Sequence, residues 1–417
     1  MDVSGQNPLE KWIFTKTGGK DIREYQLEKL NETLRYVSEK SRFYRELYCN
    51  YDVAVNNFED FEKLPFITAD DLIRRGPEML CVPQNEISRI VTLNTSGTAR
   101  EPKRVYFTEA DQELTVDFFR NGMQCLLDKS DNCMVLLPYE TPGSVGALLA
   151  AGLERLGCGV FPYGLIKDHI SAGEFMASRK ITSLVGNPVQ VLKLAELTKA
   201  SGLDIKMNSV LLSTDYVPDA ITVRLSALWQ CKVFEHYGMT EMCFGGGVFC
   251  ECLKGYHMRE ADLYFEIISE SGKSLPPGEY GEVVFTTLTR TGAPLIRYRT
   301  GDYGRFSKER CDCSGRLILM EKIRRRISGG IPGKGGRGFY IGDFDELIFS
   351  FDAVTDYSLD FRDGKARVNV LTVKKDGGEL SKAIYELIFA ETGLNPQVII
   401  NSEPGAPQEN LIKRQIV

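Results

Sequence analysis

The sequence predicts an α/β fold built from three consecutive regions, and three observations support this prediction. From residue 87 to residue 235, short apolar runs alternate with amphipathic stretches, which is typical of a parallel sheet covered by helices on both faces. After Ala261 the apolar runs have strand character and are separated by turn-forming residues such as Pro276-Pro277-Gly278. This change predicts a smaller antiparallel sheet or barrel. A glycine-rich stretch then precedes the last region, which is expected to be a small α+β domain.

The elements are assigned in chain order from the spacing of their apolar residues. Leu27, Leu30, Leu34 and Val37 recur at helical spacing and predict a helix over 23–47. The strands expected in the parallel sheet are 90–93, 133–137, 159–163, 183–185, 210–212 and 232–235, with helices over 109–126, 144–156 and 187–200. The β-rich region is expected to hold strands 263–268, 281–287 and 316–321. The last region alternates over 343–349, 356–360, 366–373, 380–392 and 396–400.

The glycine-rich stretch at 328–338 defines the predicted domain boundary. It holds six glycines and one proline in eleven residues, so neither a helix nor a strand is expected there. We therefore assign residues 1–326 to a large N-terminal domain, 327–338 to a flexible linker and 339–417 to a small C-terminal domain.

Composition excludes several classes of function. The 417 residues carry 51 Lys and Arg against 57 Asp and Glu, and the resulting charge of −6 is spread along the chain. No apolar run approaches the roughly 18 to 20 residues that a bilayer-spanning helix needs, and residues 1–20 lack the apolar core of a signal peptide. We therefore expect a cytoplasmic protein with neither nucleic acid nor a membrane as partner.

The strongest local motif is Thr95-Ser96-Gly97-Thr98-Ala99-Arg100-Glu101-Pro102-Lys103, directly after the apolar run 90–93. A strand that leads into a hydroxyl-rich, glycine-containing turn with a nearby lysine offers N–H groups, hydroxyls and a cation to a polyphosphate. The alternative is an ordinary Ser/Thr turn, and these nine residues alone do not decide between the two.

Two further motifs follow apolar runs. In Glu235-His236-Tyr237-Gly238-Met239-Thr240-Glu241, an aromatic ring suits stacking on a nucleobase, and a hydroxyl beside a carboxylate suits Mg²⁺. In Pro294-Leu295-Ile296-Arg297-Tyr298-Arg299-Thr300-Gly301-Asp302, a carboxylate at a strand end suits the two hydroxyls of a ribose. Taken singly, each motif is more often a turn.

Together and in this order, the three motifs resemble the core motifs of the acyl-adenylate-forming superfamily. The chain is most similar to its phenylacetate-CoA ligase branch, through Phe43-Tyr44-Arg45, Leu64-Pro65-Phe66-Ile67-Thr68 and the segment 281–288. The resemblance extends to about Arg326. It implies a large adenylate-forming domain and a two-step reaction, in which a carboxylate attacks the α-phosphate of ATP and a thiol, usually that of coenzyme A, then displaces AMP. Dimers are common in this branch, so a homodimer is expected.

The resemblance also implies roles for individual residues. Thr95, Ser96, Gly97, Thr98 and Lys103 match the phosphate-binding loop, while Tyr237 and Gly238 match the residues beside adenine. Thr240 and Glu241 match the pair that binds the AMP phosphate and Mg²⁺, and Asp302 matches the ribose carboxylate. Arg326 matches the arginine that follows it, and Ser213, Thr214 and Asp215 occupy the strand end that lines the adenine pocket.

The sequence departs from the family near its C-terminus. Relatives carry a lysine there, in a Gly-Lys-x-x-Arg pattern, that contacts the acyl phosphate during adenylation. The corresponding residues here are Asn410-Leu411-Ile412-Lys413-Arg414, which place Leu411 at that position, and Lys413 is the nearest substitute. Three hypotheses therefore stand: a ligase that uses CoA, an adenylating enzyme with another acceptor, and a nucleotide-binding or acyl-AMP-binding homologue without activity.

The acyl pocket is expected beside the Tyr237 motif, and an aryl or arylacetic acid is the substrate that the resemblance implies. The candidate lining residues are Tyr139, His236, Phe244, Gly245 and Gly246, together with Gly247. Three consecutive glycines leave room for a flat aromatic acid, or else form a tight turn that needs positive φ.

The eleven cysteines divide into two groups. Cys49, Cys81, Cys125, Cys133, Cys158 and Cys231 are isolated and are expected to be small core residues, and Cys243 lies beside the Tyr237 motif. Zinc prefers four N or S ligands, and similar ligand patterns occur in ligase relatives. We therefore predict a closed structural Zn²⁺ site formed by Cys252, His257, Cys311 and Cys313, with Cys250 as a spare or alternate ligand. The alternative is a set of reduced thiols.

Overall fold

The computed structural model describes residues 7–93, 101–372, 378–402 and 416. It divides into two compact units that are described separately. Unit 1 comprises Met1–Cys125, Thr141–Leu156 and His236–Lys322, and unit 2 comprises Leu126–Glu140, Gly157–Glu235 and Ile323–Val417. Among the described helices, none combines the length and the apolar character needed to cross a membrane.

The helices of unit 1 begin at side-chain caps. The predicted helix over 23–47 is two helices, because Ser41 is extended (φ −94°, ψ 130°) and its hydroxyl accepts the N–H of Tyr44 at 3.4 Å. Thr108 and Asp111 form a capping box at the start of another helix. The helices are α1 Pro8–Lys16, α2 Ile22–Lys40, α3 Arg42–Leu47, α4 Phe58–Phe61, α5 Ala69–Arg75, α6 Glu109–Met123 and α7 Val145–Leu156.

Antiparallel sheets dominate unit 1, as the β-rich character after Ala261 predicts. Strands β10 Leu263–Ile268, β11 Gly281–Thr287 and β12 Tyr298–Gly304 pair in sequence order. Strands β8 Gly247–Phe249, β9 Tyr256–Met258 and β13 Leu319–Met320 form a second antiparallel arrangement with the end of β7. The strand expected over 316–321 is therefore only two residues long.

The assignment of residues 90–93 to the buried parallel sheet is wrong. The segment is strand β1 (Arg89–Leu93), and among the described residues it pairs only with β2 (Lys103–Phe107), which is antiparallel to it. Alternate residues of β1 are exposed, as expected for a strand with one covered face.

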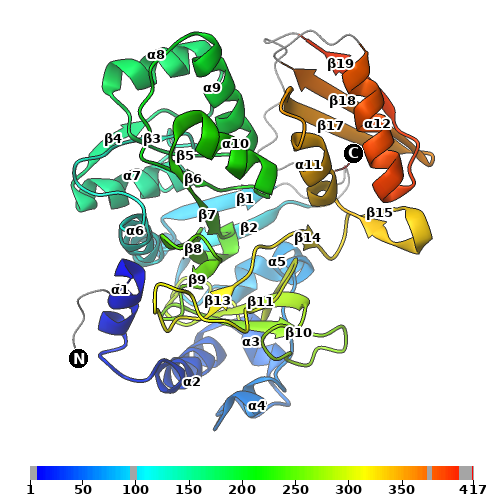
Figure 1. Ribbon diagram of the computed structural model, residues 1–417. Coiled ribbons are helices and arrows are strands. Elements are labelled where there is room, and N and C mark those ends of the chain that lie inside the picture. Colours follow the sequence, from blue (N-terminus) through cyan, green and yellow to red (C-terminus); the bar gives the residue numbers. More distant parts are fainter. Residues whose placement is uncertain (1–6, 94–100, 373–377, 403–415, 417) are drawn as a thin grey trace. The chain divides into compact units, whose positions relative to one another are not determined.

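Unit 2 contains the predicted parallel sheet, with strand order β4-β3-β5-β6-β7. These strands are β3 Asn132–Val135, β4 Gly159–Pro162, β5 Ser183–Gly186, β6 Ser209–Leu212 and β7 Lys232–Tyr237. Every residue of β5 and β6 is buried, which explains their uninterrupted apolar runs. Helices α8 His169–Arg179, α9 Pro188–Ala200 and α10 Asp219–Trp229 pack together along one side of the sheet (Figure 1).

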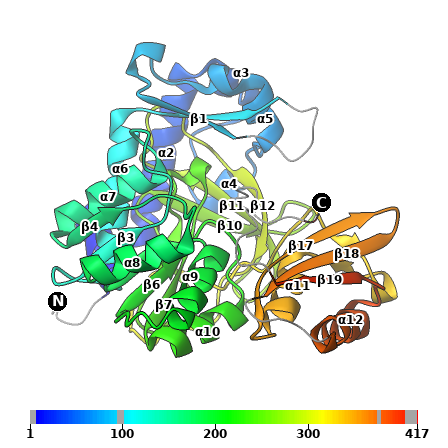
Figure 2. The same cartoon turned by 90° about the horizontal axis from the view of Figure 1, so that it is seen from above.

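The C-terminal residues of unit 2 form a sheet of their own. Strands β17 (Val354–Arg362) and β18 (Lys365–Thr372) pair antiparallel, and β19 (Gln397–Asn401) joins β18 in parallel. Helices α11 (Ile341–Phe349) and α12 (Glu379–Thr392) pack on this sheet (Figure 2). The α+β character predicted for this region is confirmed.

The glycine-rich stretch has more structure than its composition predicts. Two-residue strands β15 (Ile331–Pro332) and β16 (Gly338–Phe339) pair across it, so the expectation that no strand forms there is wrong. Strand β14 (Arg325–Arg326) precedes it.

A buried arginine joins the C-terminal residues to the rest of unit 2. Arg224 of α10 donates to the carbonyls of Val354 at 2.6 Å and Asp352 at 2.8 Å, and to the Glu196 carboxylate at 2.6 Å. One apolar core is continuous across the two parts. The domain boundaries at residues 326 and 339 remain a prediction.

Candidate functional site

Four segments of unit 1 bring the predicted nucleotide-binding side chains together. Lys103 opens β2, Tyr237 ends β7, Glu241 lies in the short 3₁₀ helix Thr240–Met242, and Tyr298 and Asp302 lie on β12. Hydrogen bonds connect these residues in two groups.

The first group is a buried ion pair with a tyrosine beside it. The Lys103 ammonium pairs with Glu241 Oε1 and also lies 3.4 Å from the Tyr298 hydroxyl. The Tyr298 hydroxyl donates to the same Glu241 oxygen at 3.2 Å. The Glu241 side chain is 2% exposed and that of Lys103 is 15% exposed. Removal of one partner would therefore leave the other charge largely buried without its counter-ion, which is costly.

Arg290 positions the backbone beneath this pair, and sequence reasoning missed it. Its guanidinium is buried, donates to the Glu241 carbonyl at 3.1 Å and to the Tyr106 carbonyl, and lies 4.9 Å from the centre of the Phe107 ring. These partners are distant in sequence, so no local pattern indicates the role of this arginine.

The second group connects the adenine-side and ribose-side motifs. The Tyr237 hydroxyl donates to Asp302 Oδ2 at 2.9 Å. The Thr300 hydroxyl accepts the Asp302 N–H at 2.9 Å and donates to the Val283 carbonyl at 2.7 Å. The carboxylate is thereby held on a fixed stretch of β12.

The residue before Tyr298 holds the start of β12 in an unusual conformation. Arg297 has φ +49°, which is uncommon for a non-glycine residue. Its buried guanidinium makes a two-pronged contact with Glu266 at 2.8 and 3.2 Å and donates to the Leu64 carbonyl at 2.6 Å. These contacts fix the strand that carries both Tyr298 and Asp302.

Close packing explains the glycines of the second motif and its continuation. A Cβ on Gly238 would lie 2.4 Å from the Phe244 carbonyl oxygen, and one on Gly245 would lie 2.2 Å from the Phe118 ring. A Cβ on Gly246 would lie 3.0 Å from the Met242 sulfur, and Gly247 is crowded by the backbone of β9. None of these four glycines has positive φ, so close packing accounts for them better than either alternative drawn from the sequence.

His236 has an aromatic environment. Its ring packs against Phe118 and Phe119 at 6.1 and 6.2 Å between centroids, and burial lowers its pKa to about 4. The imidazole is therefore neutral at physiological pH.

Unit 2 carries the other predicted nucleotide residues. Ser213, Thr214 and Asp215 follow β6, and Thr214 has φ +76° and accepts a hydrogen bond from the Asn187 amide at 3.4 Å. Arg326 is exposed on β14. Tyr139 follows β3 and is 37% exposed. Thr95, Ser96, Gly97, Thr98 and Lys413 lie outside the described residues.

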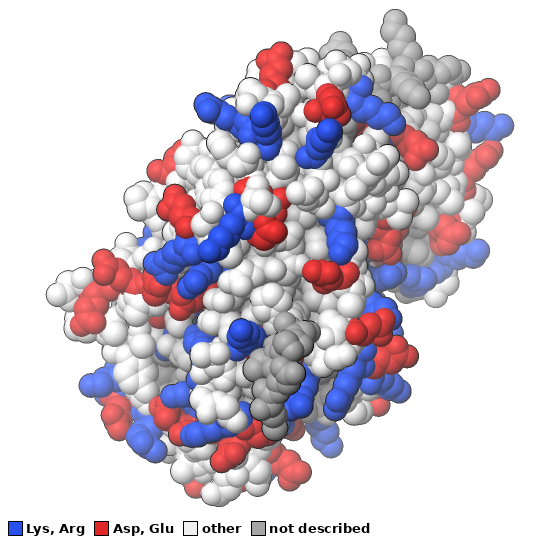
Figure 3. Space-filling view, turned by 60° about the vertical axis from the view of Figure 1, so that its left-hand side comes forward, with Lys and Arg blue, Asp and Glu red and all other residues white. Residues whose placement is uncertain are grey.

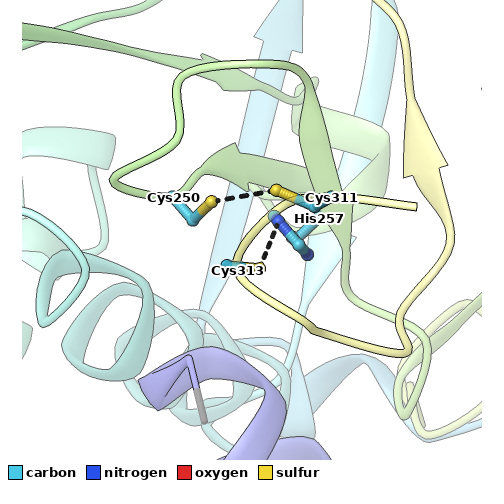
Figure 4. A group of neighbouring side chains, drawn as sticks. All are labelled: Cys250, His257, Cys311 and Cys313. Carbon is cyan, nitrogen blue, oxygen red and sulfur yellow. Dashed lines mark hydrogen bonds between the residues drawn. The ribbon is translucent and has the colours of Figure 1, made fainter. Parts of the chain in front are cut away.

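A cysteine and histidine cluster lies on strand β9 and on the loops that follow β8 and precede β13. The ligating atoms of Cys250, His257, Cys311 and Cys313 all lie within 4.8 Å of one another (Figure 4). Cys250 Sγ is 3.4 Å from Cys311 Sγ, and His257 Nε2 is 3.6 Å from Cys313 Sγ. The cluster thus contains the alternate residue Cys250 in place of the predicted Cys252.

Cys252 occupies a supporting position. Its N–H lies 3.4 Å from Cys250 Sγ, and its side chain is only half-buried.

Burial lowers the pKa of His257 to about 4, so its imidazole is neutral. Burial also raises the pKa of the Cys311 thiol, but hydrogen bonds from the Cys313 N–H and neighbouring thiols outweigh this effect and lower the pKa below its ordinary value.

The remaining cysteines mostly follow the prediction. Cys81, Cys125, Cys133, Cys231 and Cys243 are buried. Cys49 is exposed and Cys158 is half-buried, so the assignment of these two residues to the core is wrong.

The charged surface agrees with the small net charge. On the face shown in Figure 3, basic and acidic side chains are interspersed over the described residues.

Comparison with solved structures defines the class of the fold. A 2-hydroxyisobutyryl-CoA ligase in the postadenylation state has a TM-score of 0.82 at 18% identity, over 95% of this chain and 89% of that chain. The anthranilate CoA ligase AuaEII with anthranoyl-AMP has a TM-score of 0.56 at 16% identity, over 75% of this chain and 62% of that chain. The fold is therefore that of the acyl-adenylate-forming CoA ligases, as predicted.

Sequence comparison narrows the likeness to one kind of ligase. The phenylacetate-coenzyme A ligase of Pseudomonas putida is 28% identical over 299 residues, which are 68% of this chain and 66% of that protein. The enzyme of the same name from Thermus thermophilus is 28% identical over 319 residues, 73% of this chain and 70% of that protein. No protein-family model matches the chain. The resemblance predicted from the motifs is confirmed, over about two thirds of the length of these relatives.

Proposed function

We propose that this chain activates a carboxylic acid with ATP and then transfers the acyl group to coenzyme A. In the first step a carboxylate oxygen attacks the α-phosphorus, and pyrophosphate leaves. In the second step the CoA thiolate attacks the acyl carbon, and AMP leaves. The observation that carries this proposal is the constellation in unit 1, where hydrogen bonds join Lys103 to Glu241 and Tyr237 to Asp302. The likeness to phenylacetate-CoA ligases supports it.

Each side chain of the constellation has a role in this reaction. Asp302, oriented by the Tyr237 hydroxyl, accepts the hydroxyls of the ribose. Thr240 and Glu241 supply oxygen ligands that suit Mg²⁺, which neutralises phosphate charge when it is bound. The Lys103 ammonium lies where it can exchange its Glu241 partner for a phosphate oxygen. The site acts through fixed charge rather than through acid and base groups, which agrees with a chain that has only three histidines.

We propose an aryl or arylacetic acid as the substrate, bound near His236 and Phe244. The names of the relatives support an arylacetic acid. The neutral His236 ring and its neighbours Phe118 and Phe119 supply an apolar, aromatic environment that suits such an acid.

The predicted small C-terminal domain, 339–417, would supply Lys413 to the first step. We further propose that the enzyme is a cytoplasmic homodimer, which light scattering on the purified protein tests for its oligomeric state.

Isotope exchange between pyrophosphate and ATP tests the first step directly. We expect exchange that depends on an added carboxylate, with phenylacetate and benzoate above aliphatic acids, and loss of exchange in Asp302→Asn. The matched control is Asp360→Asn, a surface aspartate of β17 that pairs with Arg362. Absence of exchange with every acid would refute adenylation and favour a binding protein without activity.

Product analysis tests the acceptor. We expect an acyl-CoA thioester when CoA is present and release of acyl-AMP or its hydrolysis products when CoA is omitted. Adenylation without a thioester would favour another thiol or an amine as the acceptor.

We also propose a structural Zn²⁺ held by Cys250, His257, Cys311 and Cys313. Three sulfurs and one imidazole nitrogen from two separate chain segments match the ligand number and type of closed zinc sites. His257 is neutral and the pKa of Cys311 is lowered, whereas burial raises the pKa of Cys250 and Cys313, so a metal would have to displace the protons of these two thiols. A metal there would join the loop after β8 to the segment before β13.

Elemental analysis of the purified protein tests this site. We expect one zinc per chain, its loss in Cys311→Ser, and its retention in Cys49→Ser, the matched control at an exposed cysteine outside the cluster. A zinc-free protein whose cluster thiols all react freely with a thiol reagent would overturn the assignment.

A further inference from the structure

Helix α1 places two buried polar side chains beside the cysteine and histidine cluster. Glu10 is 0% exposed, and Asn7, the N-cap of the helix, is 7% exposed. Positions 7 and 10 lie on the same face of a helix. The Asn7 side-chain oxygen accepts from the Cys125 thiol at 3.1 Å, and Glu10 Oε2 and Cys313 Sγ both lie within 3.2 Å of a Cβ built on Gly315. The polar face of α1 therefore borders the cluster.

Two buried atoms at this border have no hydrogen-bond partner among the described residues. One oxygen of Glu10, Oε1, accepts the Arg316 N–H at 2.8 Å, whereas the other, Oε2, has no donor. His257 is also 0% exposed, and its Nδ1 has no partner. An unsatisfied buried polar atom is costly, and native structures rarely contain one without water or a ligand nearby.

Gly315 places these two groups on the same side of the cluster. A Cβ built on Gly315 would lie 2.6 Å from Glu10 Oε2, 3.2 Å from Cys313 Sγ and 3.4 Å from His257 Cε1. Glu10 Oε2 and His257 Cε1 are therefore within about 6 Å of each other. His257 Nδ1 is bonded to this carbon, so the two unsatisfied atoms lie near the same point beside Gly315, and an ordered water there would give both a partner.

We propose that Glu10 is the positioning residue of the metal centre and holds His257 through a single bridging water. This inference rests on the zinc site proposed above. His257 Nε2 faces Cys313 Sγ, so Nδ1 must carry the proton when Nε2 binds the metal. Metal-ligating histidines almost always donate this proton to a carboxylate, a carbonyl or water, and loss of that acceptor typically weakens metal binding 10- to 100-fold.

The proposal also explains why a nine-residue amphipathic helix buries a carboxylate. Glu10 joins α1, through Arg316, to the same loop that supplies Cys311 and Cys313. Glu10 and His257, more than 240 positions apart in the chain, are thus joined through one water molecule. Binding of the metal is therefore coupled to packing of α1 against the cluster.

Competition between the full-length protein and a chromophoric zinc chelator tests the proposal in Glu10→Gln. The amide oxygen of glutamine retains the Arg316 N–H, so its NH₂ group replaces Oε2 and presents a donor where an acceptor is needed. We expect zinc affinity to fall 10- to 100-fold. Gly315→Ala should act in the same direction without backbone strain, because its φ is not positive and the added methyl group, 2.6 Å from Glu10 Oε2, displaces the carboxylate.

Lys16→Met is the matched control. Lys16 fixes the other end of α1 through its 2.7 Å ion pair with Asp262, away from the cluster. Its loss should destabilise the helix but leave zinc affinity within twofold of the wild-type value. If Lys16→Met weakens zinc binding as much as Glu10→Gln does, Glu10 only docks the helix and the proposal is wrong.

NMR of the protein labelled with ¹⁵N-histidine supplies a second readout, because the chain has only three histidines. We expect the zinc-loaded wild-type protein to show one protected Nδ1–H signal that exchanges faster in Glu10→Gln. Unchanged zinc affinity and an unchanged signal in both Glu10→Gln and Gly315→Ala would overturn the role of Glu10 while leaving the zinc site intact. A wild-type protein that binds no zinc would instead refute the zinc site, and this inference with it.

Discussion

The ion pair between Lys103 and Glu241 predicts an asymmetry between two charge-removing substitutions. The Glu241 side chain is 2% exposed, whereas that of Lys103 is 15% exposed. Lys103→Met leaves a buried carboxylate that water cannot reach. Glu241→Gln leaves an ammonium that can turn towards solvent. We therefore expect Lys103→Met to lower the free energy of unfolding more than Glu241→Gln does.

The magnitudes follow from burial. Removal of one partner from a buried pair costs about 3 to 5 kcal/mol, whereas exposed pairs are worth about 1 kcal/mol or less. The Tyr298 hydroxyl continues to donate to Glu241 at 3.2 Å, which places Lys103→Met near the lower limit, at about 3 kcal/mol. Glu241→Gln should cost about 1 kcal/mol, because its amide oxygen still accepts from Tyr298.

Urea unfolding of the nucleotide-free protein measures these differences. The double variant, Lys103→Met with Glu241→Gln, should regain about 2 kcal/mol relative to Lys103→Met alone, because the buried side chain at position 241 is then neutral. The reasoning is refuted if Glu241→Gln costs as much as Lys103→Met, or if the two effects are simply additive in the double variant.

Three further predictions concern other parts of unit 1. Tyr237→Phe removes one hydrogen bond to the Asp302 carboxylate and should raise the KM for MgATP about tenfold in pyrophosphate exchange, with kcat changed less than twofold. An unchanged KM would contradict the assignment of Tyr237 and Asp302 to ribose binding. Burial raises the pKa of Glu260 from 4.5 to about 7. Between these two pH values the folded protein keeps the carboxyl protonated while the unfolded chain ionises it. The free energy of unfolding should therefore fall by up to about 3 kcal/mol as the pH rises from 5 to 7. Chemical denaturation across this range should lose that slope in Glu260→Gln, and a slope that persists would contradict the assignment. Cys250→Ser should lose bound zinc while Cys252→Ser retains it, and elemental analysis showing the reverse would restore Cys252 as the ligand.

The parallel sheet could be predicted from the sequence because its central strands are buried on both faces. Every residue of β5 and β6 is buried, so their sequences are continuous apolar runs. Strand β1 has a similar apolar run, but its partner β2 gives it only one covered face. Apolar character alone does not separate these two cases, because the pairing partner of a strand is not encoded within the strand.

The grouping of several candidate side chains in unit 1 could be predicted because they follow strand ends in a recognisable order. Tyr237, Glu241 and Asp302 lie on or beside β7 and β12; Tyr237 is hydrogen-bonded to Asp302, and Glu241 pairs with Lys103. Arg290 could not be predicted, because its partners are the carbonyls of Glu241 and Tyr106. A carbonyl carries no residue identity, so a contact of this kind leaves no pattern in the sequence.

Local geometry, which the sequence motif does not specify, decides that Cys250 rather than Cys252 belongs to the cluster. In antiparallel pairing, Val248 of β8 lies opposite His257 of β9, so Cys250 leaves the strand close to the histidine. The Cys250 sulfur then lies 3.4 Å from the N–H of Cys252, two residues on. The Cys311 sulfur accepts the N–H of Cys313 in the same way. The Cys313 sulfur accepts the N–H of Gly315, so each of the three sulfurs in the cluster has a backbone N–H directed at it, which favours the thiolate form over what burial alone would allow. Cys313 joins the cluster because its sulfur lies 3.6 Å from His257 Nε2, whereas Cys252 contacts Cys250 and Cys311 from outside the group of four mutually close ligand atoms.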